Sequence, residues 1–164
     1  MKEAIATTWI YQIVIIFILI FVSFLVLTLS YSKGYKNKNE VLSVIEKYEG
    51  VTSDSLGIIN SYLSYNNYNL KGHCPSGKGW YGVTNLNSAS LSAVKSNEKY
   101  YYCLQRKNTP KTSNLNGSKV YYNVKMFFRF NLPVLGNLKT FTIDGTTNDV
   151  FLNSNDLIGK NEKS

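Results

Sequence analysis

The chain has 164 residues, of which 44% are hydrophobic and 17% charged, with 18 basic against 10 acidic residues. This length and composition fit one folded domain, and they exclude both a disordered tail and a large multidomain enzyme. The apolar residues are concentrated near the N-terminus, which excludes an ordinary cytosolic protein.

The first element is a segment of 29 residues without a charge, from Ala4 to Ser32. Within it, residues 10–29 are apolar apart from four positions, and about 20 helical residues reach the ~30 Å thickness of a bilayer core. We predict a transmembrane helix over residues 10–32, preceded by a short N-terminal segment, residues 1–9. A cleaved signal peptide is the alternative, although its apolar core is normally only about 7–15 residues long.

Two signals disagree about the side of the membrane on which the rest of the chain lies. Lys33, Lys36 and Lys38 follow the apolar segment, whereas only Lys2 and the terminal amine precede it. The positive-inside rule alone would therefore place the following domain in the cytoplasm. The cysteines of the chain favour the opposite side.

Both cysteines, Cys74 and Cys103, come after the apolar segment. Two cysteines in a domain beside a spanning helix suggest one disulfide, and hence an oxidising compartment outside the cytoplasm; two free buried thiols are the alternative. His73 adjoins Cys74, but the chain has no second histidine, so we predict no metal site. We follow the cysteines and predict a single-pass protein of the cell membrane, with an extracytoplasmic domain over residues 33–152.

The residues that follow the span continue as helix. Only Gly34 interrupts the helical pattern, so one long helix from about Thr8 to Glu49 is expected, with Gly50 as its C-terminal cap. The part from residue 37 to 49 is amphipathic, and its apolar stripe consists of Val41, Leu42, Val44 and Ile45.

A second, shorter helix is predicted, with its N-cap among Thr52-Ser53-Asp54 and its end near Asn66-Asn67. Its apolar side consists of Leu56, Ile58, Ile59 and Leu63. The rest of the chain is β in character, and short strands are expected over residues 68–74, 80–84 and 100–106, separated by loops over 85–97 and 107–118.

The clearest β signal is the period-2 alternation over Lys119–Leu132, which predicts an antiparallel strand with one buried face. A turn over 133–137 leads to a return strand over 139–151 with a bulge at Gly145, and residues 153–164 read as a polar tail. The fold class is therefore α+β with an antiparallel sheet of about four strands. The two helices are expected to cover the even-numbered residues Val120, Tyr122, Val124, Met126, Phe128, Phe130 and Leu132.

The other face of the same strand alternates cations with aromatic rings. Nucleic acid can be held on such a surface, because bases stack on rings while phosphates attract cations. Residues 71–139 contain 11 basic residues and one acidic residue, so DNA, a wall polymer or anionic lipid would be attracted. Alternatively, this face is covered or merely solvated, and the basic bias follows from AT-rich coding DNA. The candidate ligand face is Lys119, Tyr121, Lys125, Phe127 and Arg129.

The sequence offers no catalytic constellation. His73 has no evident carboxylate partner, the acidic residues are scattered, and the glycines between residues 72 and 82 are spaced like turns rather than like a phosphate-binding loop. We predict no enzymatic activity, no cofactor and no small-molecule substrate.

Two segments resemble a known family. Ser30-Tyr31-Ser32-Lys33 leading into the helix over 37–49, and the ending Phe128-Arg129-Phe130-Asn131-Leu132-Pro133 with its return strand over 140–146, look like TadE-type minor pseudopilins of tight-adherence (Tad) pilus systems. The resemblance implies a pilin-like fold and a structural or assembly role in a bacterial pilus or secretion system, with the bilayer and other subunits as partners. The alternative is a membrane-tethered extracytoplasmic domain that binds an anionic polymer or DNA.

Overall fold

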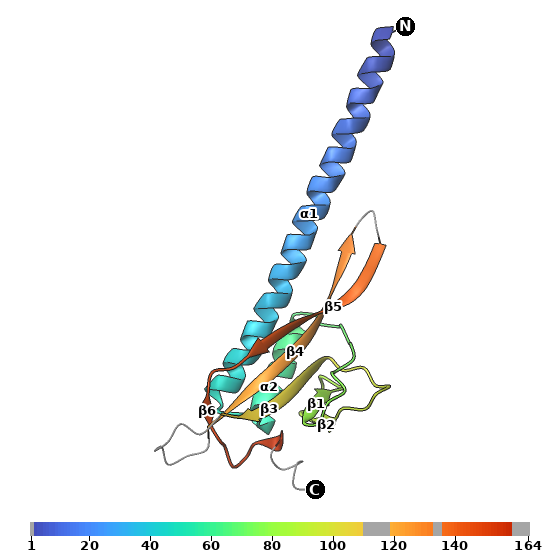
Figure 1. The fold of residues 1–164 in the computed structure, drawn as a ribbon. Coiled ribbons are helices and arrows are strands. Elements are labelled where there is room, and N and C mark those ends of the chain that lie inside the picture. The colour runs from blue at the N-terminus through green and yellow to red at the C-terminus, as the bar shows by residue number, and fades with distance from the viewer. Residues whose placement is uncertain (1, 110–118, 133–135, 159–164) are drawn as a thin grey trace.

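A computed structural model of the chain describes residues 2–109, 119–132 and 136–158. It shows two helices and a six-stranded antiparallel sheet, which confirms the predicted α+β class (Figure 1). The sequence predicted about four strands, and four of the six are at least four residues long.

The helix α1, Lys2–Lys47, is a single rod that runs through Gly34 without interruption (Figure 1). One long helix was predicted, and it is confirmed. α1 begins at Lys2, so residues 2–9, the short segment predicted before the span, belong to the same helix.

The end of α1 is closed by backbone hydrogen bonds. The amide of Glu49 donates to the carbonyl of Glu46 at 3.2 Å, and that of Gly50 donates to the carbonyl of Ile45 at 3.0 Å, the pattern of a Schellman cap. Gly50 belongs to this cap with φ +143°, but Glu49 takes the left-handed conformation, with φ +50°. The cap predicted at Gly50 is thus spread over two residues.

The second helix, α2, spans Ser53–Tyr65, and its N-cap is Thr52, the first of the three residues predicted to supply it. Thr52 and Ser55 form a capping box, in which each backbone amide donates to the other residue's hydroxyl, at 2.9 and 3.2 Å. The predicted apolar side is correct except for Ile58, which is 41% exposed, because the buried face narrows to Leu56, Ile59 and Leu63.

The strands lie in the order β2-β1-β3-β4-β5, and β6 also pairs with β4. Every pairing is antiparallel. Their bounds are Trp80–Val83 for β1, Ser92–Ala93 for β2, Tyr102–Asn108 for β3, Lys119–Leu132 for β4, Gly136–Thr146 for β5 and Val150–Phe151 for β6.

Three strand predictions need correction. Residues 68–74 form no strand and make only one bridge, between Gly72 and Tyr100. The predicted loop over 85–97 contains β2, and the return strand over 139–151 is two strands, β5 and β6. Of the predicted loop over 107–118 and turn over 133–137, residues 110–118 and 133–135 lie outside the described residues.

The C-terminal segment also differs from the prediction. Residues 153–158 are not a free polar tail, because Ile158 is fully buried in the main core and the amide of Leu157 donates to the carbonyl of Val51 at 2.9 Å. The domain therefore continues to at least residue 158. Residues 159–164 lie outside the described residues.

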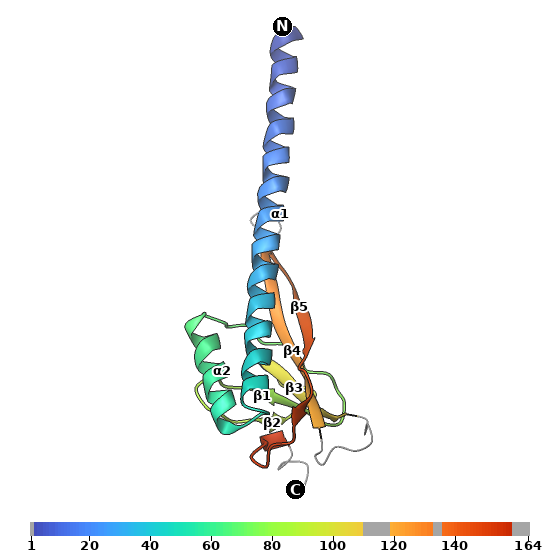
Figure 2. The same cartoon turned by 90° about the vertical axis from the view of Figure 1, so that its left-hand side faces the viewer.

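The core lies between the helices and one face of the sheet. Figure 2 shows the C-terminal half of α1 and all of α2 on the same side of the strands. The predicted stripe of α1 is confirmed, with Val41, Val44 and Ile45 buried and Leu42 half-buried. The even-numbered residues of β4 face these helices and are buried from Val120 to Phe128, while the side chains of Phe130 and Leu132 lie outside the described ones.

Gly145 does not form the predicted bulge. It pairs with Val124 in continuous register, and the irregularity of the β4–β5 ladder lies between Arg129 and Asn131. A Cβ atom at Gly145 would lie 2.8 Å from Cδ of Lys38 and 2.9 Å from Cδ1 of Leu42. The glycine is therefore what allows α1 to approach the sheet.

We expect Gly145→Ala to lower the free energy of unfolding by about 1–3 kcal/mol, because the added methyl group overpacks the contact with α1. Gly57→Ala is the matched control. A Cβ at Gly57 meets nothing within 4 Å, and alanine favours helix by about 1 kcal/mol, so this variant should be as stable as the original or more so. Urea unfolding in detergent would show the difference, and equal stability of the two variants would contradict the close-packing role.

Candidate functional site

The apolar half of α1, residues 9–29, is covered by no other described residue. Its most apolar 18-residue window has a mean hydropathy of 3.1 and none of it is buried; Phe17, for example, is 68% exposed. The hydroxyls of Ser23 and Thr28 donate to the carbonyls of Leu19 and Phe24, at 2.8 and 3.0 Å, so they need no water. This helix is long and apolar enough to cross a bilayer, and it suggests a membrane anchor.

Aromatic rings of α1 and the sheet meet where the apolar half of α1 ends. We call Tyr31, Tyr35, Phe128 and Phe141 the aromatic collar. The ring of Tyr31 is 6.2 Å from that of Tyr35 and lies edge-on to Phe128 at 6.3 Å, and Phe128 stacks on Phe141 at 5.6 Å. Rings at the end of an apolar span are typical of the membrane–water boundary.

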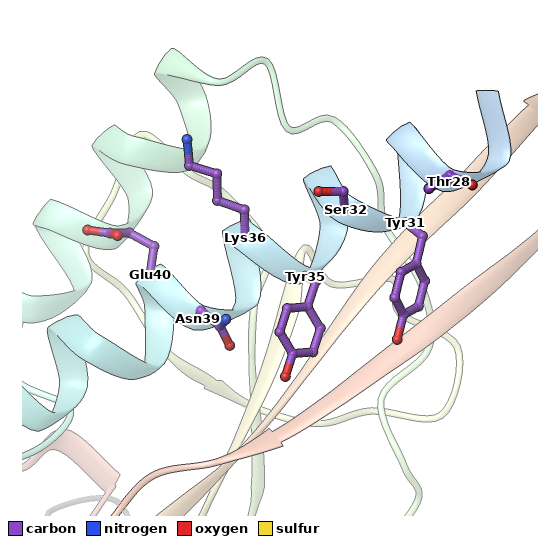
Figure 3. A pocket seen from close by; sticks show the side chains of 7 residues that line it. All are labelled: Thr28, Tyr31, Ser32, Tyr35, Lys36, Asn39 and Glu40. Atoms are coloured by element: carbon purple, nitrogen blue, oxygen red, sulfur yellow. The ribbon is translucent and has the colours of Figure 1, made fainter. Parts of the chain in front are cut away.

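A shallow groove of about 450 Å³ opens on α1 beside the collar. In Figure 3 Tyr31 and Tyr35 point toward the β4–β5 hairpin, whereas Lys36 and Glu40 point to the other side, toward α2. All the lining residues come from α1, so the groove has no opposing wall among the described residues. They are Thr28, Tyr31, Ser32, Tyr35, Lys36, Asn39 and Glu40.

Cys74 and Cys103 form a disulfide, as predicted, with their Cα atoms 5.8 Å apart. The bond fastens the segment that precedes β1 to strand β3. Because both thiols are consumed, neither is free to bind a metal, and no group of three or more candidate metal ligands occurs in the described part of the chain.

The outer face of the sheet, which points away from the helices, carries four of the five predicted ligand residues. Lys119, Tyr121 and Lys125 are partly exposed and Arg129 is exposed. Nζ of Lys119 lies 5.4 Å from the ring of Phe151, and Nη2 of Arg129 donates to Oγ1 of Thr140 at 3.4 Å. Lys125 pairs with Asp144 at 3.2 Å, so part of the positive charge of this face is already neutralised.

Phe127 does not belong to this exposed face. It is 2% exposed and packs with Tyr100 and Cys103, so it is not free to stack on a ligand. The segment before β1 also covers Phe127, because a Cβ atom at Gly72 would clash with the ring of Phe127. The alternative reading, a covered face, is therefore correct for this position.

Tyr68, a residue of the main core, binds the backbone of Phe127. Its hydroxyl accepts from the Phe127 amide at 2.9 Å and lies 2.8 Å from the Phe127 carbonyl, where β3 no longer pairs with β4. Burial raises the pKa of Tyr68 well above its usual range. The phenol of Tyr68 therefore stays neutral, and its hydroxyl serves the backbone of Phe127 in place of a neighbouring strand.

The sequence reading missed a buried polar network at the opposite end of the sheet. Asp156 is 2% exposed; its Oδ2 accepts from the hydroxyl of Tyr122 at 2.6 Å and lies 3.3 Å from Nη1 of Arg106. Its Oδ1 accepts from the amide of Ile158 at 3.0 Å. Burial, and then the hydrogen bond to Asp156, raise the pKa of Tyr122. The network closes the core, and Asp156 gave no sequence signal because it stands in a polar stretch.

Comparisons with protein families, with curated proteins and with solved structures find no match for this chain. The functional interpretation therefore depends on the arrangement of the bare apolar helix, the aromatic collar and the disulfide-bonded domain.

Proposed function

We propose that this chain is a membrane-anchored, pilin-like subunit with a structural or assembly role in a bacterial surface appendage or secretion system. The observation that carries the proposal is the division of α1 into two halves with opposite surroundings. Its first half is bare and apolar, and its second half is part of the domain core. The bare half would lie in lipid first and could then pack against the helices of neighbouring subunits.

The rigid junction between anchor and domain also supports an assembly role. No linker separates the two, because α1 passes directly from one to the other. The domain holds α1 at its lower end as well, where Oε1 of Glu46 accepts from the backbone amide of Asn148 at 2.7 Å. A tethered binding domain needs only a flexible connection. A subunit that stacks in an assembly, in contrast, needs a fixed angle between its helix and its head, as we call the folded domain that follows the apolar half of α1.

The alternative function, capture of an anionic polymer or DNA, has less support. Phe127 is buried and Lys125 is paired, so the outer face lacks the alternation of free rings and free cations on which that idea was based. We place the domain outside the cytoplasm on the basis of the disulfide, and we include no catalytic role in the proposal.

A photo-crosslinking experiment tests the assembly role. Phe17 on the bare half of α1 is replaced by benzoylphenylalanine in the cells that make the protein, and Tyr65, which is 88% exposed on α2, is the matched position in the head. We expect position 17 to give discrete adducts with a second copy of this chain or with another membrane subunit that has such a helix. We also expect the gene for this chain to lie near a gene for a secretion ATPase. Adducts with lipid alone would contradict the assembly role.

A further inference from the structure

The two cysteines of the disulfide have different surroundings. Cys103, in β3, is fully buried and packs with Tyr100 and Phe127, in a cluster that Trp80 also contacts. Cys74, in the segment before β1, is only half-buried and lies against the edge of this cluster. In the folded domain an external thiol therefore has access to the sulfur of Cys74 and not to that of Cys103.

A pocket of about 680 Å³ opens beside Cys74. Residues on both sides of β1 and β2 line it, and they include His73, Cys74, Ser76, Lys78, Val94 and Ser96. None of the described residues that line it is acidic, and Lys78 contributes a positive charge. Because the thiolate and not the thiol is the nucleophile in disulfide exchange, this charge favours the approach of a reactive cysteine.

Other contacts besides the disulfide hold the segment that carries Cys74. The backbone amide of Gly72 donates to the carbonyl of Tyr100 at 2.9 Å, and the amide of Tyr100 donates to the carbonyl of Gly72 at 2.8 Å. The hydroxyl of Tyr68 binds the backbone of Phe127 at the beginning of the same segment. These contacts would keep the two sulfur atoms close together after the disulfide is opened.

We propose that Cys74 is the residue through which a dithiol oxidoreductase makes and breaks this disulfide, and that the pocket receives the reactive cysteine of that enzyme. In reduction, the thiolate of the enzyme attacks Sγ of Cys74. The S–S bond of the chain breaks, and its electron pair passes to Sγ of Cys103, which takes up a proton.

The second thiol of the oxidoreductase completes the exchange. It loses its proton and attacks the enzyme's own sulfur in the mixed disulfide, which releases Cys74 as a thiolate. The dithiol of the enzyme is thereby oxidised to a disulfide, and the disulfide of this chain is reduced. Formation of the Cys74–Cys103 bond is the same sequence in reverse.

The surroundings of the two cysteines favour formation of the bond over its reduction. Expelling Cys103 places a thiolate among buried aromatic rings, and a buried charge without a partner is costly. In the reverse direction, Cys103 lies next to the mixed disulfide on Cys74 and resolves it without leaving the core. The inference requires only the folded head and a compartment in which disulfides form, so it does not depend on the proposed assembly role.

Two single-cysteine variants of the full chain in detergent test these roles. Cys103→Ser keeps the thiol of Cys74, and Cys74→Ser keeps the thiol of Cys103. With oxidised glutathione as the probe, we expect Cys74 to form the mixed disulfide at least about tenfold faster than Cys103, because exchange requires access. In urea the two rates should become similar. Equal rates, or a faster reaction of Cys103, in variants that keep the native near-ultraviolet spectrum would overturn the proposal.

Reduction of the original chain by reduced glutathione gives a readout that needs neither variant to fold. We expect the rate of reduction in the absence of denaturant to rise in proportion to the glutathione concentration, because the folded chain is attacked. A rate that levels off at the rate of unfolding would show that the disulfide is sealed in the folded head, and the proposal would be wrong.

The role of the pocket is tested by a reversal of its charge. Lys78→Glu should slow reduction by glutathione by about threefold or more, because the anionic thiolate is then repelled. Lys47→Glu, at the exposed end of α1, changes the net charge equally and is the matched control, so it should leave the rate unchanged. The same effect from both substitutions would show that the pocket does not receive the attacking thiolate.

Discussion

Asp156→Ala should lower the free energy of unfolding by roughly 3–4 kcal/mol, although only eight residues follow it in the sequence. The substitution removes the buried anion that lies 3.3 Å from Nη1 of Arg106, and it takes away the acceptor of the Tyr122 hydroxyl. The amide of Ile158 also loses its acceptor. Urea unfolding in detergent, followed through the near-ultraviolet signal of the tyrosines, measures the loss.

The matched control is Asp144→Ala. Asp144 also pairs with a cation, Lys125, but its side chain is 66% exposed, so its removal should cost less than about 1 kcal/mol. Tyr122→Phe should fall between the two, at about 1–2 kcal/mol, because it removes one hydrogen bond to Asp156 and keeps the ring in the core. A loss below about 1 kcal/mol for Asp156→Ala would mean that the network does not hold the C-terminal segment.

Much of the fold could be predicted from periodicity. The alternation over Lys119–Leu132 gave both bounds of β4 and its buried face, because a strand with one face on the core needs an apolar residue at every second position. The length of the uncharged run and the apolar stripe after it likewise predicted one continuous α1. These features depend on local sequence alone.

The errors arose where a distant segment decides the outcome. Gly145 was read as a bulge, but its role is set by Lys38 and Leu42, which are more than 100 positions away in the sequence. The polar tail was read from composition, whereas Ile158 reaches the core because Asp156 finds Arg106 and Tyr122. Neither contact leaves a pattern in the residues nearby.

The candidate site was predictable to a similar extent. The apolar span and the disulfide follow from residue type and order, and both are present. The ligand face was only partly correct, because alternation distinguishes the two faces of β4 but not what covers the outer one. A segment without regular structure, held by the disulfide, covers Phe127.

The disulfide and the charge pattern point to opposite sides of the membrane. Three lysines directly after the span favour a cytoplasmic head. Lys38, however, is 7% exposed, packs its stem against Gly145 and holds its Nζ 3.9 Å from the centre of the Tyr35 ring. At least one of the three lysines is thus held in the folded protein, by Gly145 and Tyr35, which weakens the positive-inside rule as a guide to the topology of this chain.

Cys74→Ser combined with Cys103→Ser should lower the free energy of unfolding by roughly 3–4 kcal/mol, the value expected for opening a loop between residues 29 positions apart. Reduction of the original chain should cause the same loss, whereas the double variant should be indifferent to reductant. Unfolding midpoints measured with and without reductant check both statements. If reduction of the disulfide is confirmed and the unfolding midpoint of the original chain does not change, the disulfide does not stabilise the fold.

The same bond decides the compartment. Thiols in the cytoplasm are kept reduced. If thiol exchange is stopped in the intact cells and the protein is then denatured without reductant, a cytoplasmic head should therefore have two cysteines that can be alkylated. A head outside the cytoplasm should present none until reductant is added. Because Cys103 is fully buried beside Phe127, denaturation before alkylation is essential: a folded head would hide this thiol on either side of the membrane. Alkylation without reductant would place the head in the cytoplasm, and it could not then be part of an external appendage.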